Sequence, residues 1–343
     1  MKRSWTYRLN IFLFLLPALI LFVGILIAPI AMSTYYSLYD FNSIPSSSSS
    51  TEMEYVGLEN YKTLFSKTII SEKTGKARDN TDRYLGEGLI NALILAALST
   101  FVQLPLALII ALKLSKGIRG ERTYLSIFFM PVLISTVIIG RLWMNIYYPS
   151  GMGGILNKIL EALGLDQWVF TKIGDQIRAN TPILQKSVKS SYEIFGGNWL
   201  ANKETALFAV FIPILWQYVG YHMLLMYAGI KGVPADLLEA AQLDGCTEGQ
   251  VNRHIIIPYI KPILKVCVIF AVTGSLKSFD LAYTLLKDNV DKAWLPSTMM
   301  YRLSFLNTKL GIGSAIAVVL IVLCFAFALL INIAFRDRGE KVS

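Results

Sequence analysis

The sequence is poor in charged residues, cysteine and histidine, and each shortage excludes a class of protein. Charged residues make up 16% of the 343 positions and hydrophobic residues 54%, whereas a soluble globular domain carries about 25% charged residues. The three cysteines and two histidines are scattered along the chain, so neither a metal site nor a disulfide framework is predicted. The composition indicates a membrane protein.

The sequence also lacks a phosphate-binding loop and a catalytic constellation. The stretch TGKA at 74–77 has no leading glycine at the spacing that G-x-x-x-x-G-K-[ST] requires. No Ser/His/Asp or paired-carboxylate arrangement stands out, and His222 and His254 fall in separate parts of the predicted topology. We expect a structural hydrogen bond at each histidine. The chain is therefore expected neither to hydrolyse ATP nor to be a membrane-embedded enzyme.

What the sequence has in abundance is long apolar runs. A transmembrane helix needs about 20 mostly apolar residues. The first run is longer than the apolar core of a cleaved signal peptide, which has about 7–15 residues. We predict an all-α membrane protein with six transmembrane helices, at about 9–37, 88–112, 123–146, 205–230, 261–286 and 310–335.

The fifth span is weaker than the others, because its charge-free core, 266–276, is too short to cross a bilayer alone. Extension to Leu286 brings in Lys277 and Asp280, which are three residues apart and can meet on one helix face. Charges inside a membrane usually mark a pocket, a water-filled path or an ion pair. The alternative is that the helix ends near Ser275 and both charges lie outside the membrane.

Charge asymmetry gives the orientation of the spans. The net charge of +9 comes from Lys and Arg that cluster beside apolar runs, as they do in cytoplasmic loops, so nucleic-acid binding is not inferred. Six spans then place the termini, 1–8 and 337–343, in the cytoplasm around one transmembrane domain at 9–336. Two outer insertions, 46–86 and 165–203, either contact an external partner or cap the span ends.

The stretch LLEAAQLDGCTEGQVNRHIIIPYIKP, residues 237–262, is a polar helix–turn–helix between the fourth and fifth spans. Asp244 and Gly245 are predicted to end its first helix, because glycine adopts the left-handed conformation at little cost. Thr247 to Gln250 has the capping-box pattern that starts a second helix. A DNA-reading motif does not fit short linkers between membrane spans. Because a plain loop would not need two capped helices, the region 234–258 is predicted to dock onto another protein.

This stretch resembles the EAA motif of binding-protein-dependent ABC importer permeases. The motif has Glu-Ala-Ala, a glycine a few residues on, and an apolar–Pro pair further along. Other blocks, such as MPVLISTVIIGRLW, ILWQYVGYHMLL and GSLKSFDLAYTLL, resemble maltose-type and glycerol-phosphate-type permeases. The chain departs from the family at LLKDNVDKAWLP, where many sugar permeases have a Thr-x-Gly-Gly-Pro-like turn. The residues that carry the expected coupling to an ATPase are Glu239, Ala240, Ala241, Asp244, Gly245 and Pro258.

The resemblance implies a type I ABC importer permease fold in a bacterial cell membrane. The motif would then insert into a cleft of a cytoplasmic ATPase, with Glu239 facing a basic residue, Asp244 supporting the turn and Gly245 allowing close contact. The implied partners are a second permease subunit, two ATPase subunits that bind ATP and Mg²⁺, and an extracellular solute-binding protein. No cofactor is expected in this chain, and the implied solute is a sugar or oligosaccharide.

The expected substrate path combines polar and aromatic residues inside the spans. Sugars are held by hydrogen bonds and by stacking on aromatic faces, and residues three or four apart share a helix stripe. Alignment from the EAA motif places several of these residues on positions that look like sugar contacts of the maltose-type permease. The aromatic residues could instead lie in a subunit interface. The predicted path comprises Thr136, Gln217, Tyr218, Tyr221, Ser275, Lys277, Ser278 and Asp280.

Two alternatives to a sugar importer stay open. Lys277 in the path would favour an anionic solute, such as an acidic sugar or glycerol phosphate. A self-sufficient secondary carrier would need its own ion-coupling site, and internal repeats with broken helices would support it. No convincing repeat is present in the sequence.

Overall fold

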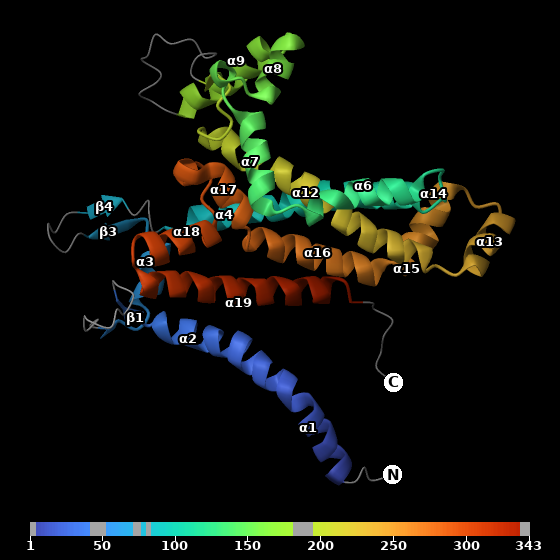
Figure 1. Cartoon of the computed structure of the whole chain (residues 1–343), viewed down its shortest axis with the longest axis horizontal. Coiled ribbons are helices and arrows are strands. Elements are labelled where there is room, and N and C mark those ends of the chain that lie inside the picture. Colours follow the sequence, from blue (N-terminus) through green and yellow to red (C-terminus); the bar gives the residue numbers. More distant parts are fainter. Residues whose placement is uncertain (1–4, 42–52, 71–76, 80–83, 181–194, 337–343) are drawn as a thin grey trace. The chain divides into compact units, whose positions relative to one another are not determined.

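The computed structural model describes residues 5–41, 53–70, 77–79, 84–180 and 195–336, and most of them are helical. Figure 1 shows the helices in chain order. The chain forms two compact units, one of 1–86 with 299–322 and the other of 87–298 with 323–343. Three helices have residues in both units: α4 (Leu85–Leu98), α18 (Pro296–Tyr301) and α19 (Leu310–Ala334).

The first unit contains the first span and two short hairpins. Its two antiparallel sheets pair β1 with β2 and β3 with β4. The buried Asn60 amide donates hydrogen bonds of 2.9 Å to the carbonyl oxygens of Ser37 and Tyr39, which fixes α3 against the end of the span. The elements are α1 (Trp5–Phe22), the π-helical turn η1 (Val23–Ile27), α2 (Ala28–Tyr36), β1 (Tyr39–Asp40), β2 (Glu54–Tyr55), α3 (Glu59–Phe65), β3 (Thr68–Ile70), β4 (Ala77–Asp79) and η6 (Arg302–Leu306).

The second unit contains the other membrane helices and the polar stretch. Its α5 and α12 pack closely, because Ala107 and Ala111 are fully buried and small side chains let helix backbones approach. Its elements are η2 (Ser99–Gln103), α5 (Leu104–Leu114), α6 (Glu121–Leu133), α7 (Thr136–Tyr147), η3 (Ser150–Met152), α8 (Ile155–Ala162), α9 (Asp166–Asn180), α12 (Lys203–Lys231), α13 (Ala235–Leu243), α14 (Glu248–Val251), η4 (Asn252–Ile256), α15 (Ile257–Tyr259), α16 (Lys261–Leu276), α17 (Asp280–Leu286) and η5 (Lys287–Lys292).

The helices match the predicted spans with one difference in shape. Five are long and apolar enough to cross a membrane, and α6 with α7 makes a sixth if the pair is one span. That pair is bent by 95°, which the sequence analysis did not anticipate. Pro131 lacks the N–H of a helix interior, and Ile134 and Ser135 then take extended backbone angles. At about 1.5 Å per residue, the 13 residues of α6 do not cross a core about 30 Å thick.

The fifth span is broken between Lys277 and Asp280. Helix α16 ends at Leu276, and α17 begins at Asp280. The two charged residues therefore lie on either side of a helix break, and the prediction that they share one helix face is wrong. Within the part of the chain that the structure describes, no ion pair joins them. The break exposes both side chains.

Candidate functional site

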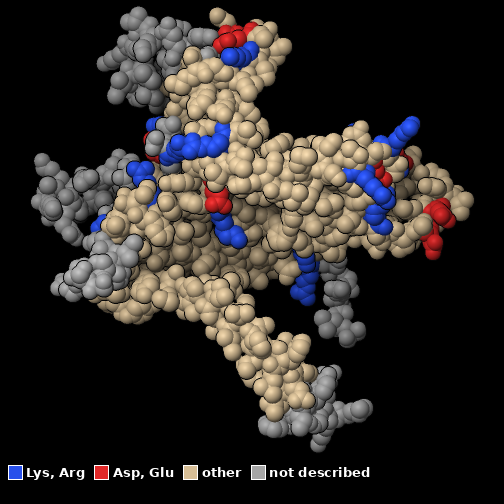
Figure 2. All heavy atoms as spheres, in the orientation of Figure 1, with Lys and Arg blue, Asp and Glu red and all other residues tan. Residues whose placement is uncertain are grey.

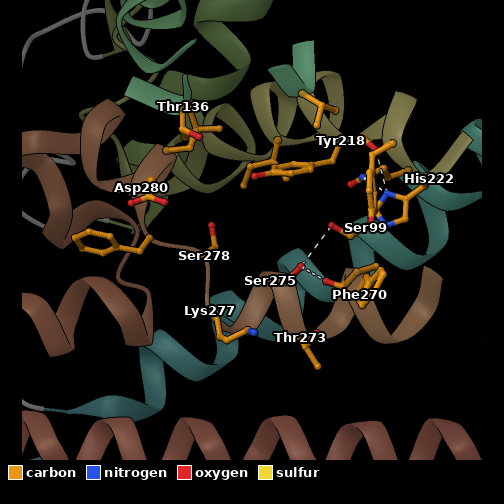
Figure 3. A pocket seen from close by; sticks show the side chains of 18 residues that line it. Ser99, Thr136, Tyr218, His222, Phe270, Thr273, Ser275, Lys277, Ser278 and Asp280 are labelled. Carbon is orange, nitrogen blue, oxygen red and sulfur yellow. Dashed lines mark hydrogen bonds between the residues drawn. The ribbon is translucent and has the colours of Figure 1, made fainter. Parts of the chain in front are cut away.

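A cavity of about 480 Å³ lies within the second unit (Figure 3). Its size is within the range of about 300–1,000 Å³ that is usual for ligand pockets. Its walls come from η2, α6, α7, α12, α16 and the break before α17. The residues around it are Ser99, Gln103, Val132, Thr136, Ile214, Tyr218, Tyr221, His222, Phe270, Ala271, Thr273, Gly274, Ser275, Lys277, Ser278, Phe279, Asp280 and Leu281.

The structure gathers most of the predicted path residues around this cavity. Gln217 does not line it: its side chain is buried, and its Nε2 donates to Thr136 Oγ1 at 3.5 Å. Gln217 faces α7, while the next residue along α12 faces the cavity. Gln217 therefore contacts the cavity only through Thr136, which it holds by this hydrogen bond. The predicted residues that line it are Thr136, Tyr218, Tyr221, Ser275, Lys277, Ser278 and Asp280.

Four polar lining residues were not part of the predicted path. Ser99 and Gln103 come from η2 in the second span, His222 comes from α12, and Thr273 comes from α16. The signal for the first two was available, since a polar residue inside an apolar span commonly faces the bundle interior. The structural hydrogen bond expected at His222 is present: its Nδ1 lies 3.1 Å from Gln103 Nε2 and 3.0 Å from the Tyr218 carbonyl oxygen.

The cavity combines aromatic faces with hydroxyl groups. Tyr221 and Phe270 have ring centroids 6.3 Å apart, and Tyr218 lies partly exposed beside them. Figure 3 shows the Tyr218 side chain in the middle of the cavity, with Asp280 at one side and His222 at the other. Aromatic faces and hydroxyls suit a ligand with both apolar ring surfaces and polar groups. Among the described residues, no cluster of His, Cys, Asp and Glu could hold a metal ion.

The predicted helix–turn–helix is present at 235–251. Gly245 has a φ of 75°, the left-handed conformation expected after Asp244 at the end of α13. The side-chain oxygen of Gln250 accepts a hydrogen bond from the backbone N–H of Thr247, with 2.7 Å between nitrogen and oxygen. The two residues form the predicted capping box. Cys246, beside this turn, is exposed. The local sequence signals were therefore sufficient for this element.

The exposed face of α13 differs in part from the expected one. Glu239 and Ala240 are exposed, as is Pro258 at the start of α15. Ala241 is only 5% exposed, because it packs into its own unit, so it is not available to a docking partner in this conformation. Leu243 is 89% exposed at the tip of the helix.

Charged contacts hold this region to the neighbouring helix ends. Glu121 at the start of α6 accepts a hydrogen bond from Tyr227 and pairs with Lys231 at 3.4 Å. Lys116 pairs with Glu248 of α14. Figure 2 shows acidic side chains over α13 and basic ones over the nearby ends of α6 and α14. These contacts join the segment before α6 to α14 and the start of α6 to the end of α12. Helix α6 leads on to the cavity wall.

Comparisons with known proteins agree with these features. Residues 103–338 match the family of binding-protein-dependent transport system inner membrane components. The chain is 31% identical over 331 residues to the probable ABC transporter permease protein YurN of Bacillus subtilis, covering 96% of this chain and 97% of that protein. It is 27% identical to the trehalose/maltose transport system permease protein MalF of Thermococcus litoralis, with 96% and 94% covered.

Two further similarities extend the comparison. The diacetylchitobiose uptake system permease protein NgcF of Streptomyces coelicolor is 27% identical, with 98% of this chain and 86% of that protein covered. The fold is similar to a chain of a bacterial ABC transporter involved in the import of the acidic polysaccharide alginate, with a TM-score of 0.70, 21% identity and 96% of both chains covered. The chain therefore belongs to the binding-protein-dependent transport system inner membrane components, and it is a membrane-spanning permease subunit of an ABC transporter.

Proposed function

We propose that this permease imports a sugar or oligosaccharide into the cytoplasm by alternating access. The observation that carries the proposal is the cavity, in which Tyr218, Tyr221 and Phe270 stand beside hydroxyl-bearing side chains. Aromatic faces pack against sugar rings, and hydroxyls exchange hydrogen bonds with sugar hydroxyls. Relatives named for uptake of diacetylchitobiose and of trehalose and maltose support the carbohydrate class.

ATP-driven movement would enter this chain through α13 and α14. In the proposed cycle, two ATPase subunits close on ATP, α13 moves with the ATPase cleft that holds it, and the cavity opens outward. The exposed Glu239, Ala240 and Leu243 form the contact surface. The ion pair of Glu121 with Lys231 and that of Lys116 with Glu248 would pass the movement on to α6.

The proposed assembly has a second permease subunit and an extracellular solute-binding protein. The solute-binding protein is supported by the similarity, at a TM-score of 0.70 and 21% identity, to a chain in an alginate transporter complex with its alginate pentasaccharide-bound periplasmic protein. It would deliver the solute to the outward-open cavity. Both termini would lie in the cytoplasm of a bacterial cell.

A second candidate is an anionic solute, and Lys277 is the observation that favours it. Its side chain is exposed at the cavity and has no carboxylate partner among the described ion pairs. An ammonium group without a partner suits a carboxylate or a phosphate. Asp280 at the same cavity restricts this preference to a ligand whose charge lies near Lys277.

The test is substrate-stimulated ATP hydrolysis by the whole complex in proteoliposomes. The panel is maltose, trehalose, diacetylchitobiose, alginate trisaccharide and glycerol 3-phosphate, each with the solute-binding protein. We expect at least one carbohydrate to raise the hydrolysis rate. Stimulation by glycerol 3-phosphate alone would replace the sugar proposal with the anionic one, and transport that needs no ATPase would contradict both.

A further inference from the structure

We propose that Gln103 and His222 form a hydroxyl-recognition pair at one end of the cavity and select the solute by an uncharged hydroxyl group there. This inference rests on the proposed import of a carbohydrate and identifies which part of the solute this end binds. Both residues line the cavity. Gln103 is 1% exposed and His222 4%, so neither side chain has free access to water.

Each of the two side chains has one polar atom without a partner. The atoms are Gln103 Oε1 and His222 Nε2, and both are buried. Buried polar groups in proteins are nearly always hydrogen-bonded, and an unmade bond costs free energy. Two such atoms, on side chains that contact each other and both line one cavity, indicate that a ligand group completes them.

The contact between the two residues determines which ligand group fits. Gln103 and His222 meet through Gln103 Nε2 and His222 Nδ1, 3.1 Å apart. The Tyr218 carbonyl oxygen, 3.0 Å from Nδ1, can only accept, so Nδ1 carries the proton of the neutral imidazole. Amide oxygen and nitrogen are assigned from their hydrogen bonds, so the Gln103 atom that faces Nδ1–H is the amide oxygen. The free atoms are then a donor, the amide nitrogen of Gln103, and an acceptor, Nε2 of His222.

The pair therefore offers one donor and one acceptor to the cavity. A hydroxyl is a donor and an acceptor at once, so it suits both atoms. An ionised carboxylate only accepts and an ammonium only donates, so each would leave one protein atom unpaired. The pair accordingly favours an uncharged hydroxyl over an ionised group.

A wide helical turn places Gln103 at this wall. Residues 99–103 form the π-helical turn η2, and both Ser99 and Gln103 are buried. Such turns occur mostly as single insertions in helices and frequently at functional sites. Ser99 extends the polar wall to α16, because Ser275 Oγ lies 3.4 Å from Ser99 Oγ. The hydroxyl-recognition pair is thus followed along the wall by the hydroxyl groups of Ser99 and Ser275.

The cavity then has two chemically different ends. Figure 3 shows His222 and Ser99 at one side and Asp280 at the other. Lys277 and Asp280 are exposed and charged. Gln103 and His222 are buried and present one hydrogen-bond donor and one acceptor. A solute with one ionised substituent would orient that group towards Lys277 and an unmodified sugar unit towards Gln103 and His222.

The test compares a sugar with its monodeoxy derivatives in the complete complex. The sugar is whichever of maltose, trehalose and diacetylchitobiose stimulates ATP hydrolysis most. In the unchanged protein, we expect one derivative to need a roughly three- to tenfold higher concentration for half-maximal stimulation, as the loss of one neutral hydrogen bond implies. In His222→Phe this penalty should vanish, because the hydroxyl has lost its partner.

The controls separate recognition from folding. Gln103→Met should remove the same penalty, and His222→Gln, which keeps an amide near the position of Nε2, should retain part of it. Met223→Leu changes a buried residue of the same helix outside the cavity and should leave the penalty intact. The solute-binding protein is the same throughout, so its own preferences cancel in these ratios.

The outcomes distinguish this inference from the proposed function. Stimulation by a sugar with equal deoxy penalties in His222→Phe and in the unchanged protein overturns the hydroxyl pair and leaves carbohydrate import standing. Failure of every carbohydrate in the panel, alginate trisaccharide included, to stimulate hydrolysis overturns carbohydrate import and, with it, the hydroxyl-recognition pair.

Discussion

Lys277 is the lysine that lines the cavity, and we propose that its charge selects among solutes. We expect Lys277→Gln to raise the half-saturating concentration of an anionic solute, such as alginate trisaccharide, about tenfold, because a charge-assisted hydrogen bond is lost. A neutral sugar should change less than about twofold, since uncharged contacts at an exposed lysine are weak. The measurement is solute-stimulated ATP hydrolysis by the reconstituted complex.

The matched control is Lys265→Gln on α16, the helix that ends just before Lys277. Lys265 is half-buried, does not line the cavity and donates to Asn332 Oδ1 at 3.0 Å. It should leave both solutes unaffected. Equal losses for the anionic and the neutral solute in Lys277→Gln would contradict a role of the lysine charge.

Glu239 is the exposed residue of α13 through which we propose that the chain couples to an ATPase. We expect Glu239→Lys to abolish uptake, because the reversed charge would meet a basic residue of the partner. The protein should stay folded, since exposed substitutions usually change the free energy of unfolding by less than about 0.5 kcal/mol. Uptake in cells and the thermal midpoint of the purified chain measure the two effects.

Glu161→Lys is the comparison for this charge reversal. Glu161 is exposed on α8, in the outer segment, and its reversal should leave uptake normal. If Glu239→Lys also transports normally, the contact surface on α13 has been assigned wrongly.

At the same scale, residue type and spacing predicted the cavity lining better than the side-chain partners. Tyr218 and Tyr221 could be placed on one stripe because helix periodicity fixes their directions. Gln217 was predicted to line the path but does not line the cavity, since its direction depends on where α7 lies. Ala241 was expected on the docking surface because its motif position was known, while its burial depends on packing within the unit.

At the scale of elements, α12 and α6 approach each other closely at Gly220. A Cβ added at Gly220 would overlap the carbonyl oxygen of Phe128. We expect Gly220→Ala to lower the free energy of unfolding by about 1–3 kcal/mol, the usual cost of overpacking a core. Uptake should fall as well, because α6 and α12 both contribute to the cavity wall.

Gly249→Ala provides the contrast for this substitution. Gly249 lies in α14 with nothing within 4 Å of an added Cβ, and alanine is the better helix former by about 1 kcal/mol. Its thermal midpoint should be unchanged or higher. A Gly220→Ala protein as stable as Gly249→Ala would show that α6 can move away from α12.

Sequence periodicity could not predict where the helices are interrupted. The capping box and the left-handed Gly245 have local signals, and both are present. The bend after Pro131 and the break at Lys277 depend on how the surrounding helices pack and on how the backbone groups left without helical hydrogen bonds are satisfied. The π-helical turn at 99–103 has no local signature, because its extra residue changes hydrogen bonding without changing composition.

For the molecule as a whole, the sequence predicted the class and the number of spans, with α6 and α7 counted as one. Apolar length and charge asymmetry are sufficient for that because the bilayer imposes both. The division into two compact units follows from long-range packing, which a single sequence does not display.

The whole-molecule prediction concerns what accompanies the chain. The first span is Leu9–Tyr36, and no residue in its most apolar part is buried. The surface of this helix is therefore free to contact lipid or another subunit. We expect the chain, purified from its native membrane in mild detergent, to carry a P-loop ATPase, a second permease subunit and a solute-binding protein, identified by mass spectrometry.

The control for this purification is the Glu239→Lys chain. We expect it to co-purify with the second permease subunit but without the ATPase. A chain that purifies alone, or only with copies of itself, would contradict the proposed assembly and reopen the secondary-carrier hypothesis.

The exposed turn at the tip of α13 has a practical consequence. Of the three cysteines, Cys246 is exposed, Cys267 is buried and Cys324 is half-buried, and thiol reagents react with accessible thiols first. A maleimide fluorophore would therefore attach selectively at Cys246 without engineered cysteines. Its emission would report, in real time and in the unmodified sequence, each arrival and departure of whatever protein covers Leu243.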